Sequence, residues 1–308
     1  MSRKLGLSLL ALNCFAISAQ SSRNPALVST DYRLPSNTVT AAPGQLSLLS
    51  LGGIGQKPGL PARALPGPNG YSGELRGIRI QIIPTNGAAL ETQLVALQQS
   101  GCPAGIQVCS PITSITTLFP RDLPANLTGT LTVLDGLSTV SEFPFRSVTD
   151  NLHFLNSCDD TLVWVGLFDS APNKDTCLPA IIQNGRLVNT DNPLKPGGGV
   201  ASYLYGGGAT TLREDEFKRE ETVQTFDVGF DYRPNAPGAR PIPGVSLIVK
   251  PFLSVGFAGG LNQVNFMIPP IPDGLQLLRC DGANIRSNLT ITISGTNSID
   301  SASFCVEP

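Results

Sequence analysis

The sequence predicts an all-β protein built from two sandwich modules in tandem. Short apolar segments, many with period-two alternation, recur along the chain and are separated by Gly- and Pro-rich turns. Turn landmarks also occur twice in the same order, as expected for two copies of one module. The paired landmarks are Pro43-Gly44 with Pro196-Gly197, Pro120 with Pro269, and Asp135-Gly136 with Asp281-Gly282.

Length and composition agree with this organisation. The chain has 308 residues, which is enough for two domains that each bury a core. Charged residues make up 14% of it, against roughly 25% in an average soluble protein, and 26 Pro with 32 Gly indicate many turns. The formal net charge of −2 gives no electrostatic basis for binding nucleic acid, so we expect no nucleic-acid partner.

The N-terminus has the pattern of a secretory signal. Arg3 and Lys4 precede an apolar stretch at residues 5–17, and small residues then allow cleavage after Ala19. A lipoprotein signal ending at Cys14 is the alternative, although the residue before that cysteine is not small.

The expected organisation is therefore a signal peptide at 1–19, a first module at 20–150 and a second module at 151–308. The mature protein would be secreted or extracytoplasmic, at the cell surface or in the periplasm, with no membrane insertion after signal cleavage.

The cysteine count supports export. Six cysteines follow the signal, and an even number in an exported chain predicts disulfides. Local spacing favours three short loops, although six cysteines also allow other connectivities. The pairs are Cys102–Cys109, Cys158–Cys177 and Cys280–Cys305. Because no C-x-x-C motif occurs and His153 is the only histidine, we expect no zinc site.

The first half contains a polar lead-in at 20–41, a mostly apolar strand at 45–51 and a Pro/Gly loop at 56–70. In the next strand Ile78, Ile80 and Ile82 alternate with polar residues. That strand is predicted at 77–83, and further strands are predicted at 114–119, 129–135 and 138–145. The segment 91–100 could be a strand or a short helix, and its position between two strands favours a strand.

The second half begins with a strongly apolar strand at 159–169 and a hairpin around Asn184-Gly185. A charged run at 212–221 interrupts the apolar pattern and is expected to be a solvated, self-paired loop. Strands are predicted at 180–183, 186–189, 200–205, 223–232, 245–252, 261–268, 275–280 and 287–295.

Several of these residues resemble a bacterial module. An N-P-x-x-P-G pattern followed by a strand, a Gly-rich turn, a Q-x-N-x-x-x-P motif and a final S-N-x-T strand is similar to the Solibacter uncharacterised C-terminal domain, an acidobacterial family. The matching residues are Asn192, Pro193, Pro196, Gly197, Gln263, Asn265, Pro269, Ser287, Asn288 and Thr290.

The resemblance covers residues 180–308, and a diverged copy covers 42–150, with Thr116 and Leu118 where the Gln–Asn pair would fall. It implies tandem immunoglobulin-like β-sandwiches with local disulfides in an exported protein, and it implies no activity.

No catalytic constellation stands out. His153 would have to serve any Ser/His/Asp or Cys/His machinery, and no G-x-S-x-G accompanies it, so a structural role is expected. The acidic residues near it lack the D-x-D-x-D-G spacing of a calcium loop and are interpreted as solvated turns: Asp159, Asp160, Asp169 and Asp175. We expect no enzyme activity, cofactor or metal.

Glycines at 52–55 and 206–208 lack the G-K-[ST] of a phosphate loop and are expected to be turns. Asn126 and Asn288 match glycosylation sequons, which a bacterial source would leave unused.

Three residues are candidates for binding. Trp164, the single tryptophan, is expected to pack in a sandwich core more readily than to stack on a sugar. Gln263 and Asn265 lie two residues apart on a strand and so share one face, where they would bind a ligand or pin a loop.

The expected function is that of a secreted or cell-surface, non-catalytic structural or adhesive protein, with an extracellular protein or polysaccharide as partner. A carbohydrate-binding module associated with extracellular polysaccharide is the alternative, and it requires exposed Trp164 or tyrosines on one sheet face. An unrecognised hydrolase would require His153 in a cleft beside Asp or Ser.

Overall fold

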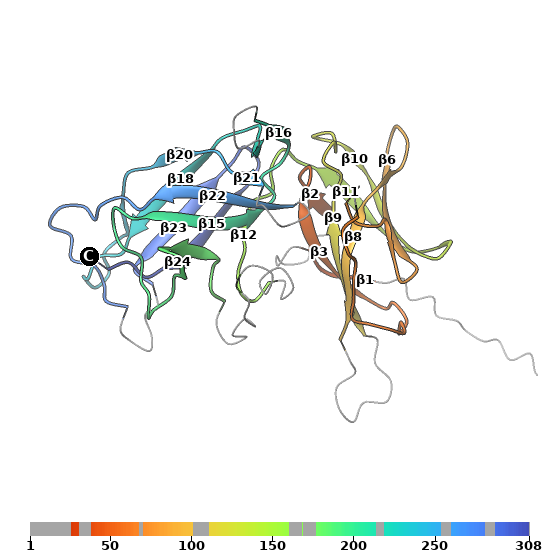
Figure 1. Cartoon of the computed structure of the whole chain (residues 1–308), viewed down its shortest axis with the longest axis horizontal. Coiled ribbons are helices and arrows are strands. Elements are labelled where there is room, and N and C mark those ends of the chain that lie inside the picture. The colour runs from red at the N-terminus through yellow and green to blue at the C-terminus, as the bar shows by residue number, and fades with distance from the viewer. Residues whose placement is uncertain are drawn as a thin grey trace, which may run out of the picture.

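A computed structural model describes residues 26–30, 38–67, 70–100, 111–159, 168, 177–213, 219–253, 260–280 and 287–307. The elements formed there are β-strands, and they gather into two sandwiches that lie side by side along the long axis (Figure 1). The predicted fold class, tandem immunoglobulin-like sandwiches, is confirmed.

The first sandwich has two facing sheets whose strand orders match an immunoglobulin plan, with the first strand split between the sheets. One sheet contains, in order, β1 (Ala26–Thr30), β3 (Leu46–Gly52), β9 (Ile112–Leu118), β8 (Gln93–Gln99) and β4 (Ala62–Arg63). The other contains β2 (Val39–Ala41), β11 (Ser138–Ser147), β10 (Thr128–Asp135), β6 (Ile78–Pro84) and β5 (Glu74–Leu75), with β7 (Leu90–Glu91) beside β6.

The second sandwich repeats the plan with a larger first sheet. That sheet contains β14 (Arg186–Leu187), β13 (Ile181–Gln183), β15 (Gly199–Tyr205), β22 (Leu261–Met267), β21 (Phe252–Leu253), β17 (Glu220–Thr222) and β16 (Thr210–Leu212), with β12 (His153–Phe154) beside β15. The facing sheet contains β19 (Ile242–Pro243), β18 (Phe226–Tyr232), β23 (Leu289–Ser294) and β24 (Ile299–Phe304), with β20 (Leu247–Val249) on β18.

Two of the three paired landmarks are structurally equivalent. The Pro-Gly turns precede β3 and β15, where Gly44 N–H donates to Pro120 O and Gly197 N–H donates to Ile268 O. Asp135-Gly136 joins β10 to β11, whereas β23 begins only at Leu289, after Asp281 and Gly282, which lie outside the described residues. The third pairing is therefore wrong, because the turn equivalent to Asp135-Gly136 is the one between β23 and β24.

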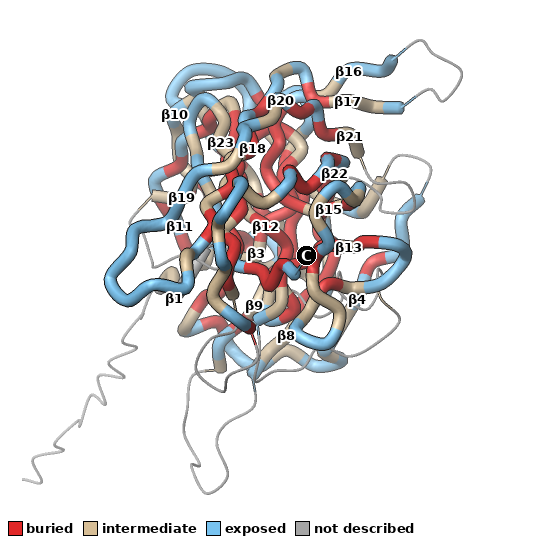
Figure 2. Tube along the Cα trace, turned by 90° about the vertical axis from the view of Figure 1, so that its left-hand side faces the viewer, coloured by how far each residue is buried: buried red, intermediate tan, exposed pale blue. Residues whose placement is uncertain are grey.

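The described residues form three hydrophobic clusters. Each sandwich has its own core between its two sheets, containing Ile78, Ile80 and Ile82 in the first and Phe226 and Phe230 in the second. The third, here called the intermodule cluster, takes residues from both sandwiches: Leu46, Val95, Leu118, Leu155, Ala180, Tyr205 and Leu261. In the view of Figure 2 buried chain lies at the centre and exposed chain lies at the periphery.

The prediction that 20–41 is a polar lead-in outside the core is wrong for its described parts. Its described parts form β1, which pairs with β3, and β2, which pairs in parallel with β11. Val39 and Ala41 are buried in the first core despite their polar neighbours. The short length of β2 leaves too few residues for an alternation pattern to be visible.

Two predicted strands of the second half also differ. The segment 245–252 does not stay in one sheet: β20 joins the sheet of β18, and β21 joins that of β22 after Pro251. The segment 275–280 forms no named strand, because it crosses the end of the sandwich and makes one isolated bridge at Leu277, which packs on the core.

Candidate functional site

A shallow groove lies on the outer face of the second sandwich, over β15 and β22. Strand alternation directs Val200 and Phe266 to the interior and leaves their neighbours facing outward. The hollow is shallow and open to solvent, close to a flat face. We call it the outer groove; it is lined by Gly199, Val200, Ala201, Gln263, Asn265, Phe266 and Met267.

Gln263 and Asn265, two of the predicted binding residues, both line the outer groove. The Gln263 Nε2 donates to Asn265 Oδ1 at 2.9 Å. Gln263 is half-buried beside Tyr203, its partner on β15, while Asn265 is exposed opposite Ala201. The expected role of pinning a loop is not seen among the described residues, because the two amides bond to each other at the surface. The expected role in binding stays a prediction.

The aromatic platform required by the carbohydrate alternative does not occur among the described residues. Trp164 lies outside the residues that the structure describes. Tyr203 is half-buried with Phe168 edge-on to its ring at 6.5 Å, and burial raises the pKa of the Tyr203 phenol. Tyr205 and Tyr232 are buried. The described tyrosines are therefore buried or half-buried, and none of them is exposed on a sheet face.

His153 is held between two carboxylates. Its Nδ1 lies 3.0 Å from Asp300 Oδ2 on β24, and its Nε2 lies 3.0 Å from Asp159 Oδ2. The ring also stacks on Tyr205, with centroids 6.3 Å apart. The same carboxylates accept main-chain N–H groups of Phe154 and Asn156, so they fix the segment as well as the ring.

The electrostatics of this clamp favour an imidazolium. Burial alone lowers the pKa of His153, but the hydrogen bonds and charges of Asp159 and Asp300 outweigh it and raise the pKa to about 9. Interaction with His153 in turn lowers the pKa of Asp300, against the opposite effect of its burial. With a carboxylate at each nitrogen, the ring is not placed to take a proton from a nucleophile, and the arrangement suits an ion pair that fastens β12 to β24.

Two of the three expected disulfides are present. Cys158–Cys177 and Cys280–Cys305 close short loops with sequence separations of 19 and 25. Cys102 and Cys109 lie outside the described residues. The first disulfide lies next to Asp159 and thus tethers the segment that clamps His153. Disulfides of this kind indicate an oxidising compartment outside the cytoplasm.

The acidic residues singled out as calcium candidates do not assemble into a described site. Asp159 pairs with His153, while Asp160, Asp169 and Asp175 fall outside the described residues. Within the described ranges, no group of three His, Cys, Asp or Glu side chains is arranged to hold a metal ion.

The charged run is only partly self-paired. Glu221 does pair locally, with Arg213 at 2.9 Å. Glu220 instead reaches the first module, where Arg121 Nη1 donates to both of its carboxylate oxygens at 2.9 Å. The expected self-paired loop is therefore corrected at Glu220; residues 214–218, with Glu214, Asp215, Glu216 and Lys218, lie outside the described ranges.

The glycines at 206–208 do more than turn the chain. A Cβ at Gly206 would lie 2.0 Å from Asn151 O, and one at Gly208 would lie 2.1 Å from Thr149 O. Gly207 N–H donates to Asn262 Oδ1 at 3.1 Å. Only glycine permits the segment that joins the modules to approach the second sandwich this closely.

Two polar residues of the joining segment fasten it on both sides. Asp150, fully buried, accepts N–H groups of Thr296, Asn297 and Ser298 in the turn between β23 and β24. Asn151 Nδ2 donates to Thr40 O and Gln45 Oε1 of the first module. The joining segment is therefore bonded to both sandwiches.

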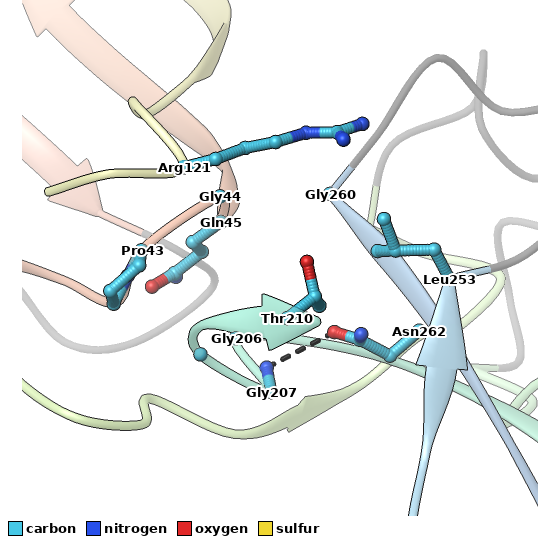
Figure 3. A pocket seen from close by; sticks show the side chains of 11 residues that line it. Pro43, Gly44, Gln45, Arg121, Gly206, Gly207, Thr210, Leu253, Gly260 and Asn262 are labelled. Atoms are coloured by element: carbon cyan, nitrogen blue, oxygen red, sulfur yellow. Dashed lines mark hydrogen bonds between the residues drawn. The ribbon is translucent and has the colours of Figure 1, made fainter. Parts of the chain in front are cut away.

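A narrow cleft lies where these contacts meet (Figure 3). Its lining comes from both modules, including Gln45 and Arg121 of the first and Thr210, Leu253 and Asn262 of the second. The space within it is about 10 Å³, roughly what one water molecule needs, so the cleft is part of the interface and not a ligand pocket.

The two sequons have different surroundings. Asn126 is exposed before β10, with a positive φ of 61°. Asn288 is buried, and its Nδ2 donates to Leu278 O and Val306 O while its Oδ1 accepts from Val306 N. Asn288 therefore pins the segment after β24 to the sandwich.

Sequence reasoning missed the junction between the modules. Asp150, Asn151, Arg121 and Glu220 showed no motif, because each acts through a partner distant along the chain. The Gly-rich run was the available signal, since three consecutive glycines exceed what a tight turn needs.

Comparisons with known proteins do not identify a family for this chain. The scan against protein-family models gave no match, and no curated protein matched the chain. No helix in the described residues is long and apolar enough to cross a membrane.

Proposed function

We propose that this protein is a non-catalytic structural or adhesive component of the cell exterior, in which two immunoglobulin-like modules act as one rigid unit. The observation that carries the proposal is the intermodule cluster, in which Leu46 and Leu118 of the first sandwich pack with Tyr205 and Leu261 of the second. Tandem modules joined by a buried apolar contact hold a fixed geometry, which suits spacing and presentation.

The polar junction supports the same function. Asp150 and Asn151 fasten the joining segment to both modules, and Arg121 pairs with Glu220 across the interface. A flexible linker would lack such contacts. The outer groove then remains in a fixed position relative to the first module.

The clamped state of His153 supports a role without acid–base catalysis. Its two ring nitrogens face Asp159 and Asp300, and the raised pKa keeps the ring charged near neutral pH. The described surface offers a shallow groove where an enzyme would be expected to have a deeper cavity with convergent reactive groups.

Export and family membership are part of the proposal. Cleavage after Ala19, secretion or surface display, and membership of the Solibacter C-terminal domain family are supported by the signal pattern, the ordered motifs and the two disulfides.

Two measurements on the source cells test this function. Antibody labelling of intact cells and of the culture medium should detect the protein outside the cytoplasmic membrane. Purified protein should also co-sediment saturably with the cell envelope or the extracellular matrix. Detection only in the cytoplasm, or no saturable binding to either fraction, would overturn the proposal.

A further inference from the structure

The two described disulfides differ in their access to solvent. Cys158 and Cys177 are both exposed, whereas Cys280 is 9% exposed and Cys305 is 2% exposed. Thiol–disulfide exchange requires a thiolate to reach one of the two sulfur atoms, and exposed disulfides are the ones that are readily reduced. The Cys158–Cys177 disulfide should therefore react with a reductant before the Cys280–Cys305 disulfide does.

We propose that Cys158–Cys177 is a redox-reactive site, reduced by a dithiol, and that its reduction loosens the contact between the two modules. This inference rests on the proposed function in taking the oxidised protein as one rigid unit. It adds a reaction that controls how rigidly the modules are joined.

The disulfide closes a short antiparallel segment at the edge of β15. β12 and β13 pair with the same edge of this strand, up to Leu204 and from Ser202 onward. Between these two pairings the chain leaves the sheet and returns to it. We call residues 155–158 and 177–180 the stalk, with one arm on each side of the disulfide.

Few hydrogen bonds join the two arms of the stalk. Ser157 N–H donates to Leu178 O at 2.8 Å, and Ala180 N–H donates to Leu155 O at 2.7 Å. Leu178 N–H donates to Ser157 Oγ at 2.8 Å. Because a two-stranded ribbon of this length is at best marginally stable in water, the disulfide should supply much of the stability of the stalk.

The stalk also supplies part of the contact between the modules. Leu155 and Ala180 are fully buried in the intermodule cluster, and Leu178 packs against it. On the side of the first module, the same cluster contains Leu46 and Leu118. Movement of the stalk would therefore withdraw apolar side chains from the surface that joins the two sandwiches.

The first arm has a second anchor that the other arm lacks. Asp159 directly follows Cys158, and its Oδ2 accepts Asn156 N–H at 2.6 Å and lies 3.0 Å from His153 Nε2. Reduction leaves this anchor in place. The arm at 177–180, which carries Ala180 and Leu178, is therefore the one that should loosen.

The reaction balances as ordinary thiol–disulfide exchange. One thiolate of the dithiol attacks a sulfur atom of the protein, which breaks the S–S bond and forms a mixed disulfide. The second thiol of the dithiol then displaces the protein sulfur. Two electrons and two protons pass to Cys158 and Cys177, and the dithiol leaves as an intramolecular disulfide.

Differential alkylation tests which disulfide reacts. The folded, oxidised protein would be treated with dilute dithiothreitol, quenched with iodoacetamide at intervals and mapped by peptide mass spectrometry. Cys158 and Cys177 should become labelled at least about tenfold faster than Cys280 and Cys305, because the buried sulfur atoms are reached only when the sandwich opens. Equal rates at the four cysteines, or faster labelling of Cys280 and Cys305, would overturn the inference.

Amide hydrogen exchange tests whether the stalk loosens. A crosslink that closes a loop of this size shifts a local opening equilibrium on the order of a hundredfold. The Ala180 amide should therefore exchange faster by about that factor after reduction. Thr92 N–H, which donates to Ile80 O in the first module, should keep its rate. An unchanged rate at Ala180 would contradict the loosening.

Residual dipolar couplings of each sandwich test the effect on the junction. One alignment tensor should fit both modules in the oxidised protein, and the two tensors should differ in magnitude after reduction. The variant Cys158→Ser/Cys177→Ser is the matched control, because it should resemble the reduced protein and respond no further to dithiothreitol. Tensors that stay equal after reduction, or a variant that still responds to dithiothreitol, would overturn the inference.

Circular dichroism would show whether the double variant is folded. If it is not, alkylation, exchange and dipolar couplings of the unaltered protein still decide the matter. The failures of the two proposals are distinct. Unequal tensors in the oxidised protein would refute the rigid unit of the proposed function, whereas equal tensors before and after reduction would refute only the redox inference.

Discussion

By the strand registers, one equivalent position on the outer faces of the two modules has opposite surroundings. On β9 of the first module, Leu118 is 4% exposed and packs in the intermodule cluster. Its equivalent on β22, Met267, is 53% exposed and borders the outer groove. The same strand position thus lies in the interface in one copy and faces solvent in the other. The outer face of the second module's sheet joins the interface at its opposite end, through Tyr205 and Leu261.

The largest expected effect comes from removing the close approach at the junction. Gly206→Ala would place a Cβ 2.0 Å from Asn151 O at a residue with φ of +76°. Steric clash and left-handed strain together should lower the free energy of unfolding by about 4 kcal/mol. Chemical denaturation followed by tryptophan fluorescence and circular dichroism measures this.

Gly197→Ala is the matched control. Gly197 has a similar φ of +72°, but a Cβ added there would meet no heavy atom of the described residues within 4 Å. The substitution should cost only about 1–2 kcal/mol from strain. Equal losses in the two variants would show that the junction is not tightly packed.

A second pair of variants tests the contrast between Leu118 and Met267 directly. Leu118→Ala should lower the free energy of unfolding by about 3 kcal/mol, because a buried leucine leaves a cavity in the intermodule cluster. Met267→Ala, at the equivalent exposed position, should change it by less than about 0.5 kcal/mol. Similar values at the two positions would contradict the assignment of one face as interface.

The clamp at His153 should make stability depend on pH. Because the folded-state pKa of His153 is raised from 6.5 to about 9, its stabilisation is fully present below 6.5 and is lost as the pH rises through 9. The loss should reach about 3 kcal/mol. Denaturation midpoints between pH 6 and 10 measure it, with His153→Gln as the reference for other groups that titrate there.

In that comparison the difference between the unaltered protein and His153→Gln should shrink with increasing pH. A difference that stays constant from pH 6 to 10 would mean that the two carboxylates do not hold the imidazolium.

The smallest effect is expected at the ion pair across the junction. Arg121 and Glu220 have side chains that are 51% and 35% exposed, so solvent screens their attraction. Arg121→Ala should lower the free energy of unfolding by about 0.5 kcal/mol in low salt. The effect should fall further at 1 M salt. A loss of several kcal/mol would show that the pair, and not the apolar cluster, holds the modules together.

The sequence determined the strands that carry a visible pattern. Ile78, Ile80 and Ile82 alternate because one face of β6 meets the core, and the repeated Pro-Gly turns mark β3 and β15. The shared face of Gln263 and Asn265 also followed from strand periodicity alone.

The junction could not be read from sequence in the same way. Asp150 acts on Thr296, 146 positions away, and Gly206 is required by the approach of Asn151. In the sequence, a glycine that turns the chain cannot be told from a glycine that makes room for a neighbouring backbone. The split of β20 and β21 between sheets likewise depends on partners in different parts of the chain.

Residual dipolar couplings of backbone amides test the central claim that the two modules form one rigid unit. Couplings would be measured for both sandwiches in a weakly aligned sample and fitted separately. The account predicts the same alignment tensor, in magnitude and orientation, for both modules placed as in Figure 1. Tensors of clearly different magnitude would show that the modules move independently and would contradict it.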